Sequence, residues 1–343
     1  MSNLVLVGTL PNPIGGVSSF CYRLCEKDQG SVIDELIDPY FDAEKVTLKS
    51  RITVTSKKGC YSNKWVWLFR ALIKKNRDVI HFNFSSSRAL LFLAILPKRR
   101  NKWLLTLHNG NLKLPSQWVL RRISRYSLGK MDIIFSLCEK HNQYYKKNHV
   151  SCSKVRKTSS YIYQAIEPQH LDSELLSKWR KCSRGYKRRY IASGYPVKIY
   201  NHLETLKIFK GRPECFLTMC LYGPDAEGLL KELLKYNQEP NIYIYTDMNQ
   251  TTFNQILSES DVYLRPNEVD SFGIVVADAI NMGLTVIASD ACERYSGALV
   301  FNGMDQYQAF IDQAMQQDCG SGDRANFSDS YADYKTTYIV QKS

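Results

Sequence analysis

The sequence has few of the features that mark membrane-spanning, secreted or zinc-binding proteins. Its longest apolar run, Ala89 to Leu96, has eight residues, far fewer than the roughly 20 that a spanning helix needs. The first residues contain no basic segment and only four consecutive apolar side chains, which predicts no signal peptide. The ten cysteines show no CxxC or Cys/His zinc spacing, and we interpret them as buried side chains of a protein in a reducing compartment. These absences favour a cytoplasmic protein.

Acidic residues are scarce in the first part of the chain. Residues 1–189 contain 35 Lys and Arg but only 13 Asp and Glu, a balance of +22, whereas residues 190–343 contain 11 and 20, a balance of −9. Such asymmetry indicates an anionic partner for the basic part. Nucleic acid, an anionic membrane and a phosphorylated substrate all fit this charge.

The 343 residues are enough for about two domains, and 44% hydrophobic residues predict folded domains rather than disorder. Short apolar strands alternate with helical patterns along the chain, which predicts α/β domains with parallel, doubly wound sheets. Strands are expected near residues 4–7, 79–82, 103–107, 132–135, 190–192, 242–245, 262–264 and 285–288. A basic stretch, 171–189, marks the expected boundary between an N-terminal domain, 1–185, and a C-terminal domain, 186–320. A polar tail, 321–343, follows and is expected to be the least ordered part.

The most informative segment runs from Ser260 to Asp290. An apolar strand ends near Leu264, a loop follows, and a helix begins near Phe272-Gly273. A helix start presents backbone N–H groups to an anion, so a diphosphate fits here. Asp270 in the loop can accept hydrogen bonds from sugar hydroxyls, and Asp278, about two turns along the helix, can reach a ribose diol. In the simpler alternative, Asp270 caps the helix and Asp278 lies on its solvated face.

This segment resembles the donor site of retaining glycosyltransferases of family 4, in which two acidic residues, usually Glu, lie eight positions apart around a Phe-Gly pair. The resemblance continues through Met282-Gly283 and the next strand to Arg294. It implies a GT-B fold, with two Rossmann-like doubly wound domains facing a central cleft and the donor on the C-terminal one. The donor-binding residues that it implies are Gly15, Gly16, Lys198, Arg265, Asp270, Ser271, Phe272, Gly273, Ile274, Asp278 and Arg294.

Two elements of the first half are similar to further parts of this family. Gly15-Gly16 follows the first strand, as the family's N-terminal glycine loop does, and its backbone could approach a phosphate. A plain tight turn is the alternative. Thr106-Leu107-His108 follows another strand and resembles the family's Thr-x-His element, in which the imidazole faces the transferred sugar. A purely structural histidine is the alternative.

The sequence departs from the family at the basic pair that binds the diphosphate. Tyr195 stands where the family usually has Arg, and Lys198 is the remaining candidate cation. Either Arg265 or Arg294 could compensate for the missing charge, or each could be a surface ion-pair residue.

The resemblance implies catalytic roles for Lys198, Asp270 and His108. It predicts transfer of a hexose or N-acetylhexosamine, with retention, from a nucleotide-diphosphate sugar, UDP-linked by preference. The expected acceptor is a lipid-pyrophosphate-linked oligosaccharide of O-antigen or capsule assembly. We expect no cofactor and no metal ion, because the sequence has neither an Asp-x-Asp nor an HExxH motif. The alternatives are a GT-B enzyme with a soluble acceptor, a glycoside hydrolase with paired carboxylates, and a basic nucleic-acid-binding protein. Against the last alternative, the sequence contains no RNP, zinc-finger or helix-turn-helix signature.

Basic clusters of the first half recur beside aromatic residues. Lys98-Arg99-Arg100 precedes Trp103, and Arg121-Arg122 follows Trp118. Basic side chains are attracted to anionic lipid, and aromatic rings settle at headgroup depth. The pattern predicts peripheral binding to the inner face of the cytoplasmic membrane, through the N-terminal half.

Overall fold

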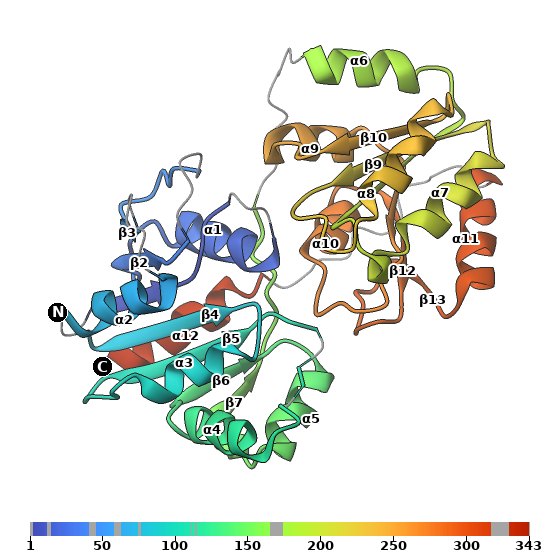
Figure 1. Cartoon of the computed structure of the whole chain (residues 1–343). Helices are drawn as coiled ribbons and strands as arrows, with labels where there is room; N and C mark the ends of the chain where they lie inside the picture. Colours follow the sequence, from blue (N-terminus) through green and yellow to red (C-terminus); the bar gives the residue numbers. More distant parts are fainter. Residues whose placement is uncertain are drawn as a thin grey trace. The chain divides into compact units, whose positions relative to one another are not determined.

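The structure is a computed structural model that describes residues 3–11, 15–40, 46–57, 63–74, 77–110, 112–113, 115–164, 174–316 and 329–342. The chain divides into two compact units. Unit 1 comprises Met1–Gln164 and Asp329–Ser343, and unit 2 comprises Ala165–Ser328. Each unit is an α/β body with one sheet and its own core (Figure 1).

Unit 1 contains a parallel sheet with the strand order β3-β2-β1-β4-β5-β6-β7 among the described residues. The strands are β1 (Leu4–Val7), β2 (Glu35–Asp38), β3 (Thr53–Ser56), β4 (Val79–Phe84), β5 (Lys102–Leu107), β6 (Ile133–Ser136) and β7 (Val155–Lys157). The helices are α1 (Gly16–Asp28), α2 (Lys64–Lys74), α3 (Ala89–Ile95), α4 (Trp118–Gly129), α5 (Glu139–Lys147), the short η1 (Cys152–Lys154) and α12 (Tyr331–Lys342). The order reverses between β1 and β4, as in a doubly wound sheet.

Unit 2 repeats this plan with the order β10-β9-β8-β11-β12-β13, again parallel throughout. Its strands are β8 (Arg188–Gly194), β9 (Cys215–Leu221), β10 (Ile242–Thr246), β11 (Val262–Arg265), β12 (Thr285–Ser289) and β13 (Ala298–Phe301). Its helices are α6 (Glu174–Ser183), α7 (His202–Lys210), α8 (Leu230–Leu234), α9 (Gln250–Ser258), α10 (Ile274–Asn281), α11 (Met304–Gln316) and the short η2 (Lys198–Tyr200) and η3 (Lys235–Gln238). β9 is buried along its whole length, because helices cover both faces of a parallel sheet.

The unit boundary lies before the basic stretch rather than within it. The helix α6 belongs to unit 2, where the Trp179 indole is fully buried and donates to Thr218 Oγ1 of β9 at 2.8 Å. The stretch is rich in charged residues, but Leu176 and Trp179 lie on one face of α6 and pack into the core of unit 2. Unit 2 therefore begins at residue 165 instead of 186.

The expected C-terminal tail contains a helix, α12, that belongs to unit 1. Tyr334 and Tyr338 are buried, and the Tyr338 hydroxyl lies 2.6 Å from His81 Nδ1 on β4. The Tyr334 ring lies 4.6 Å from that of Phe135 on β6. These tyrosines supply apolar rings with polar tips, so a segment that reads as polar packs on the sheet.

Candidate active site

The carboxyl edge of the unit 2 sheet contains a topological switch point. From β8 the chain adds β9 and β10 on one side, and it later adds β11, β12 and β13 on the other. Gly194 ends β8 and Arg265 ends β11, so these two residues flank the point of reversal. Open α/β sheets bind ligands in the crevice outside such a point. The segment singled out in the sequence, 260–290, lies at this edge.

The loops after β8 and β11 are joined by two hydrogen bonds. Glu268 N–H donates to Ile199 O at 2.8 Å, and Asn201 Nδ2 donates to Pro266 O at 2.8 Å. Lys198, the candidate cation, therefore lies in an exposed turn that is tied to the candidate donor loop. Its own N–H donates to Glu227 Oε2 at 2.8 Å.

Asp270 lies between two arginines. Arg265 Nε donates to Asp270 Oδ2 at 3.0 Å and Arg265 Nη2 donates to Oδ1 at 3.2 Å, whereas Arg294 Nη1 donates to Oδ2 at 2.8 Å. The side chains of Arg265, Asp270 and Arg294 are only 10%, 7% and 1% exposed. Two guanidinium charges thus share one carboxylate in a buried place, and the cluster carries a net positive charge.

The hydrogen bonds of Asp270 reach beyond the two arginines. Its carboxylate also accepts the N–H of Ser271 at 3.1 Å, so four donors occupy the roughly four acceptor positions of a carboxylate. Burial alone would raise its pKa, but the charges and hydrogen bonds of Arg265 and Arg294 hold the pKa well below the usual range. Asp270 is not the helix cap either, because Gly273 holds that position. In the structure Asp270 therefore holds two arginines in place, and its contact with sugar hydroxyls stays a prediction.

The two arginines are not surface ion-pair residues. Arg294 Nε donates to Ser289 O at 2.7 Å, which fixes the side chain to the end of β12. The Arg265 guanidinium lies 5.6 Å from the centre of the Tyr200 ring, and the Asn267 amide oxygen can accept from its Nε and Nη2 at 3.1 Å. The nearby carboxylate raises the pKa of Arg265 against the effect of burial. Both cations are held in fixed positions at the sheet edge.

The start of α10 requires a glycine. Gly273 has φ 71°, and a Cβ there would lie 3.2 Å from Asp270 Oδ2, 3.2 Å from Arg294 Nη1 and 3.1 Å from Val276 Cγ2. Gly273, the N-cap residue, has no side chain that could cap the first turn. The preceding Phe272 is buried and meets the Tyr295 ring edge-on at 4.8 Å. Ile274, also buried, is the first helical residue. A helix start beside net positive charge is suited to an anion.

Asp278 lies in the second turn of α10 and is 4% exposed. This burial overturns the alternative of a solvated helix face. Its contact with a ribose stays a prediction.

Aromatic packing explains the tyrosine that replaces the family's arginine. The Tyr195 ring meets the Tyr222 ring at 4.9 Å and lies directly over Gly223, where a Cβ would clash with it. Gly194 gives the same space to the Tyr200 ring. The loop after β8 is therefore packed with aromatic rings where the family usually has an arginine. The fixed cations of the site are instead Arg265 and Arg294.

The remaining predicted residues lie in unit 1. His108 directly follows β5, and its Nε2 is 3.2 Å from Asn83 Oδ1 at the end of β4. Burial, with a smaller effect of the neighbouring His141, lowers the pKa of His108 to about 3, so the imidazole is neutral at physiological pH. Gly15 caps α1 with an extended backbone, and a Cβ on Gly16 would meet no atom within 4 Å. The roles of these three residues toward a donor stay predictions.

Several residues that shape the site were not predicted from the sequence. Tyr200 stacks on Arg265, Ser289 anchors Arg294, and Asn83 holds His108. Ser289 and Asn83 are polar residues at the carboxyl ends of strands, and this position could have identified them as site residues. No sequence pattern pointed to Tyr200.

Among the described residues, no three His, Cys, Asp or Glu side chains gather as a metal site. No described helix is long and apolar enough to cross a membrane.

Residues 190–309 match the family described as Glycosyl transferases group 1, and this stretch contains both arginines, Asp270 and the start of α10. The chain is a glycosyltransferase with a GT-B fold. Solved structures are similar to it in fold over its full length. A complex of Anabaena Alr3699/HepE with UDP and glucose matches with a TM-score of 0.72 and 11% identity, over 100% of this chain and 97% of that one. The catalytic domain of starch synthase IV from Arabidopsis thaliana, bound to ADP and acarbose, matches with a TM-score of 0.72 and 11% identity, over 99% and 98%.

A curated relative comes from Klebsiella pneumoniae. This uncharacterized 41.2 kDa protein of the cps region is 23% identical to the glycosyltransferase over 296 residues, which are 80% of this chain and 78% of the relative. The predicted fold and enzyme class are confirmed. Both sheets are parallel and doubly wound, as the alternation of strands and helices predicted.

Proposed function

We propose that the glycosyltransferase moves a hexose or N-acetylhexosamine, with retention of configuration, from a UDP-sugar to a lipid-pyrophosphate-linked oligosaccharide of surface polysaccharide assembly. The observation that carries the donor assignment is the buried cluster of Arg265, Asp270 and Arg294 beside the start of α10, where Gly273 is the N-cap residue. Its net positive charge complements a diphosphate. UDP is preferred because Anabaena Alr3699/HepE, one of the similar structures, was solved with UDP and with UDP-glucose, and ADP, as in starch synthase IV, is the next candidate.

The proposed reaction needs little side-chain acid or base chemistry. The bond between the anomeric carbon and the diphosphate oxygen breaks, and the acceptor oxygen bonds to that carbon from the same face. The acceptor's proton passes to the leaving diphosphate. Charge on that leaving group grows in the transition state, so fixed cations and helix N–H groups stabilise the transition state more than the bound donor. Arg265, Arg294 and the exposed Lys198 are the groups of unit 2 that supply this charge.

The acceptor proposal rests on the surroundings of the relative and on the basic unit. The Klebsiella pneumoniae relative belongs to a cps region, which fits capsule assembly better than a soluble acceptor. A neutral His108 at the carboxyl edge of unit 1 fits contact with an uncharged sugar.

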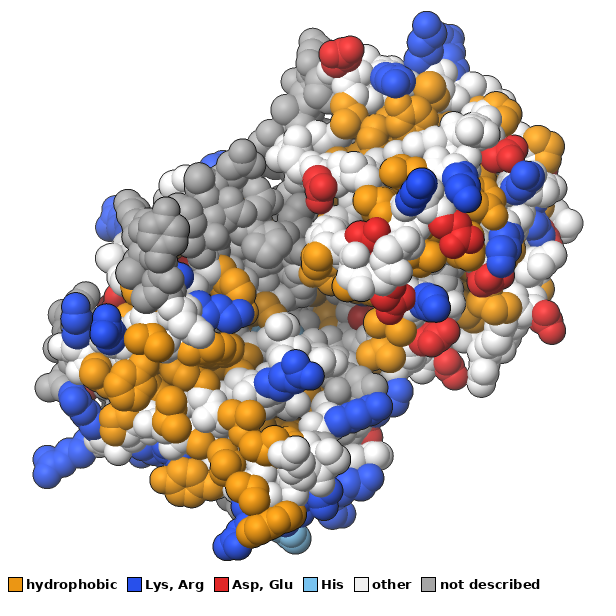
Figure 2. Space-filling view, viewed as in Figure 1, with side chains coloured by type: hydrophobic (Ala, Val, Ile, Leu, Met, Phe, Trp, Pro, Cys, Tyr) orange, Lys and Arg blue, Asp and Glu red, His pale blue; other side chains and the backbone are white. Residues whose placement is uncertain are grey.

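The proposed membrane surface lies on α2, α3 and α4. Figure 2 shows hydrophobic side chains gathered on the face where Figure 1 places these helices, with Lys and Arg around them. The exposed apolar side chains of these helices are Val66, Ile95, Trp118, Val119 and Tyr126. Each engaged Lys or Arg adds about 1 kcal/mol of attraction to anionic lipid. Arg121 and Arg122 on α4 are exposed and are suited to this contact.

Release of nucleoside diphosphate tests the donor proposal. We expect release from UDP-glucose or UDP-N-acetylglucosamine only when a lipid-linked acceptor is present, and less from GDP- and ADP-sugars. Activity in EDTA should match activity in manganese, because the proposed leaving-group charge is met by protein groups. Complete loss in EDTA that manganese restores would refute metal independence.

Sedimentation with liposomes tests the membrane proposal. Binding should appear with phosphatidylglycerol, fall steeply with salt and weaken in R121E/R122E. Equal binding to neutral and anionic vesicles at low salt would refute it without affecting the donor assignment.

A further inference from the structure

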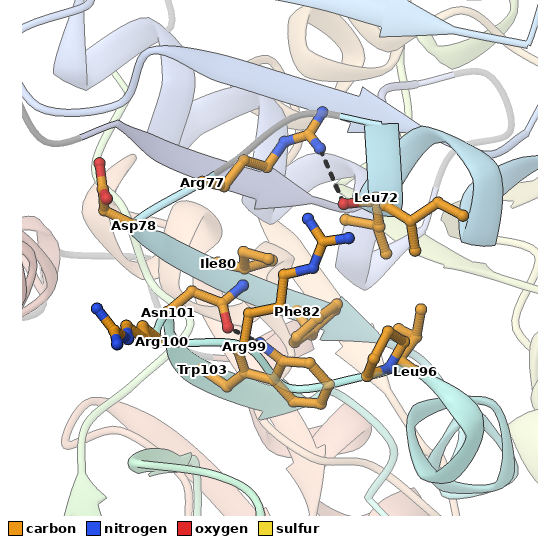
Figure 3. A pocket seen from close by; sticks show the side chains of 12 residues that line it. Leu72, Arg77, Asp78, Ile80, Phe82, Leu96, Arg99, Arg100, Asn101 and Trp103 are labelled. Atoms are coloured by element: carbon orange, nitrogen blue, oxygen red, sulfur yellow. Dashed lines mark hydrogen bonds between the residues drawn. The ribbon is translucent and has the colours of Figure 1, made fainter.

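Two of the buried arginines differ in how their terminal nitrogens are used. Arg77 lines a cavity of about 310 Å³ in unit 1 (Figure 3). Its Nη1 donates to Ala71 O at 2.8 Å and its Nη2 to Glu35 Oε2 at 3.2 Å, so both nitrogens have partners within the unit. Arg265 is also buried, but among the described residues its Nη1 has a single hydrogen bond, to Ser193 O at 3.5 Å. That bond is longer than the usual range of about 2.7–3.2 Å, so Nη1 retains the capacity to bind a ligand oxygen.

Arg265 is also the more exposed of the two arginines that bind Asp270. Its side chain is 10% exposed, compared with 1% for Arg294. Arg294 is anchored to Ser289 O and Asp270 and mainly adds positive charge. Arg265 is therefore the arginine of this cluster whose orientation matters most for a ligand.

Two contacts determine the orientation of the Arg265 guanidinium. Asp270 accepts from Nε at 3.0 Å and from Nη2 at 3.2 Å, which fixes one edge of this planar group. The centre of the Tyr200 ring lies 5.6 Å from the guanidinium carbon, within the distance of about 6 Å over which a ring face attracts a cation. Because the ring lies against the guanidinium, it restricts the tilt of the plane about the fixed edge. The direction of Nη1 depends on that tilt.

The Tyr200 ring is itself held in place by its neighbours. It stacks on the His202 ring at 5.5 Å with an angle of 25° between the planes, and it meets the Tyr195 ring edge-on at 5.9 Å. A Cβ on Gly194 would lie 2.1 Å from Tyr200 Cδ1, so the ring fits only because residue 194 is a glycine. The Tyr200 hydroxyl makes no hydrogen bond within the part of the chain that the structure describes. The ring, and not the hydroxyl, therefore makes the contacts.

We propose that Tyr200 is a positioning residue of the glycosyltransferase, whose ring holds the Arg265 guanidinium so that Nη1 meets the leaving diphosphate. This role rests on the proposed function, in which Arg265 stabilises that diphosphate. Tyr200 ends the short helix η2, in the loop after β8 where the family usually has an arginine. Here the loop acts on the diphosphate through an aromatic ring and an arginine of β11.

Calorimetric titration of UDP and of uridine into Tyr200 variants tests this role. Wild type should bind UDP at least tenfold more tightly than uridine. Tyr200→Leu should lose most of this preference and leave uridine binding unchanged, because only the contact with the phosphates is disturbed. Tyr200→Phe retains the ring and should retain the preference. Tyr200→Met, with a flexible side chain of similar length, should behave like Tyr200→Leu, and melting curves show that each variant is folded.

Tyr243 provides a matched control in the same unit. Its ring lies 5.5 Å from Lys178 Nζ and 4.4 Å from the Tyr245 ring, so it also combines a cation with a neighbouring aromatic ring. It lies near the amino-terminal end of β10, at the sheet edge opposite the site. Tyr243→Leu should therefore leave the affinities for UDP and uridine near those of wild type.

A double variant shows whether Tyr200 acts through Arg265. In an Arg265→Ala background, Tyr200→Leu should change UDP affinity by less than about twofold, because the two residues share one contact with the ligand. A further loss as large as in wild type would overturn the positioning role, and so would a loss of the UDP preference in Tyr200→Phe. If Arg265→Ala loses the preference and Tyr200→Leu keeps it, the role of Tyr200 is refuted and the proposed function is not. Equal affinities for UDP and uridine in wild type would instead refute the diphosphate assignment on which both depend.

Discussion

Arg294 Nη1 lies 2.8 Å from Asp270 Oδ2, although twenty-four positions separate the two residues in the sequence. This bond joins the segment after β12 to the loop after β11, and Arg265, the last residue of β11, also binds Asp270. The loop that precedes α10 is therefore fixed before any ligand arrives. Such preorganised charge acts on a developing diphosphate without reorganisation.

Replacement of Asp270 should harm folding as well as activity. In Asp270→Ala, two buried guanidinium charges lose their shared carboxylate, and breaking such a cluster costs about 3–5 kcal/mol. We expect a clear drop in the free energy of unfolding, measured with urea, and loss of transfer. Glu204→Ala is the control, because the Glu204 side chain is 47% exposed in its pair with Lys207 and should cost under about 1 kcal/mol. An Asp270→Ala protein as stable as wild type would contradict the buried cluster.

Gly273 and Gly283 provide a matched pair at the two ends of α10. Both have positive φ, 71° and 84°, so either change to Ala carries backbone strain of roughly 1–2 kcal/mol. Only at Gly273 would the new Cβ crowd Asp270 and Arg294, since nothing lies within 4 Å at Gly283. We expect Gly273→Ala to weaken UDP binding at least tenfold and Gly283→Ala to leave it near wild type. Equal effects would mean that strain alone decides.

The stability of the protein should fall in acid partly through His202. Burial, assisted by the charge of Arg265, lowers the pKa of this 1% exposed imidazole to about 3, compared with about 6.5 in the unfolded chain. The unfolded state then binds more protons, so this contribution is complete above pH 6.5 and is lost toward pH 3 at up to about 1.4 kcal/mol per pH unit. Urea unfolding between pH 7 and 4 should show a shallower slope in His202→Asn. The exposed His149→Gln serves as control, and an unchanged slope in His202→Asn would contradict the prediction.

The helix α12 should be needed for the stability of unit 1. Tyr338→Phe removes the hydroxyl 2.6 Å from His81 Nδ1 and leaves a buried polar atom unpaired, at a cost of about 1–3 kcal/mol. Ile339→Ala changes a neighbour that is 51% exposed and should cost far less. Thermal melting compares the two variants, and equal midpoints would show that α12 contributes little to the fold.

The sequence patterns predicted the repeated alternation of strands and helices and the helix start at Gly273, because apolar periodicity and a glycine before a helix are local signals. They did not predict β2, in which Glu35 and Asp38 are buried. Arg77 pairs with Glu35, and the N–H of Leu10 donates to Asp38 at 2.9 Å. Acidic residues are unfavourable in a buried strand unless they are paired, and their pairing partners here lie far away in the sequence.

The same limit applies to the candidate site. Arg265 and Arg294 were predicted from the sequence as possible cations of the site. Their shared contact with Asp270 could not be predicted, because it depends on the order of the strands in the sheet. Asp270 was predicted to contact sugar hydroxyls and Asp278 a ribose, whereas the fold surrounds Asp270 with arginines. That arrangement depends on three-dimensional packing.

Calorimetric titration of UDP and of uridine into wild type, Arg265→Ala and Arg212→Ala shows whether the arginine cluster holds the diphosphate. Arg212 pairs with Asp312 in the same unit at 2.7 Å, and it is a control for the loss of a partly buried arginine. If the cluster holds the diphosphate, wild type and Arg212→Ala bind UDP at least tenfold more tightly than uridine, and Arg265→Ala loses most of that difference. Equal affinities for UDP and uridine in wild type, or an undiminished difference in Arg265→Ala, would contradict the account.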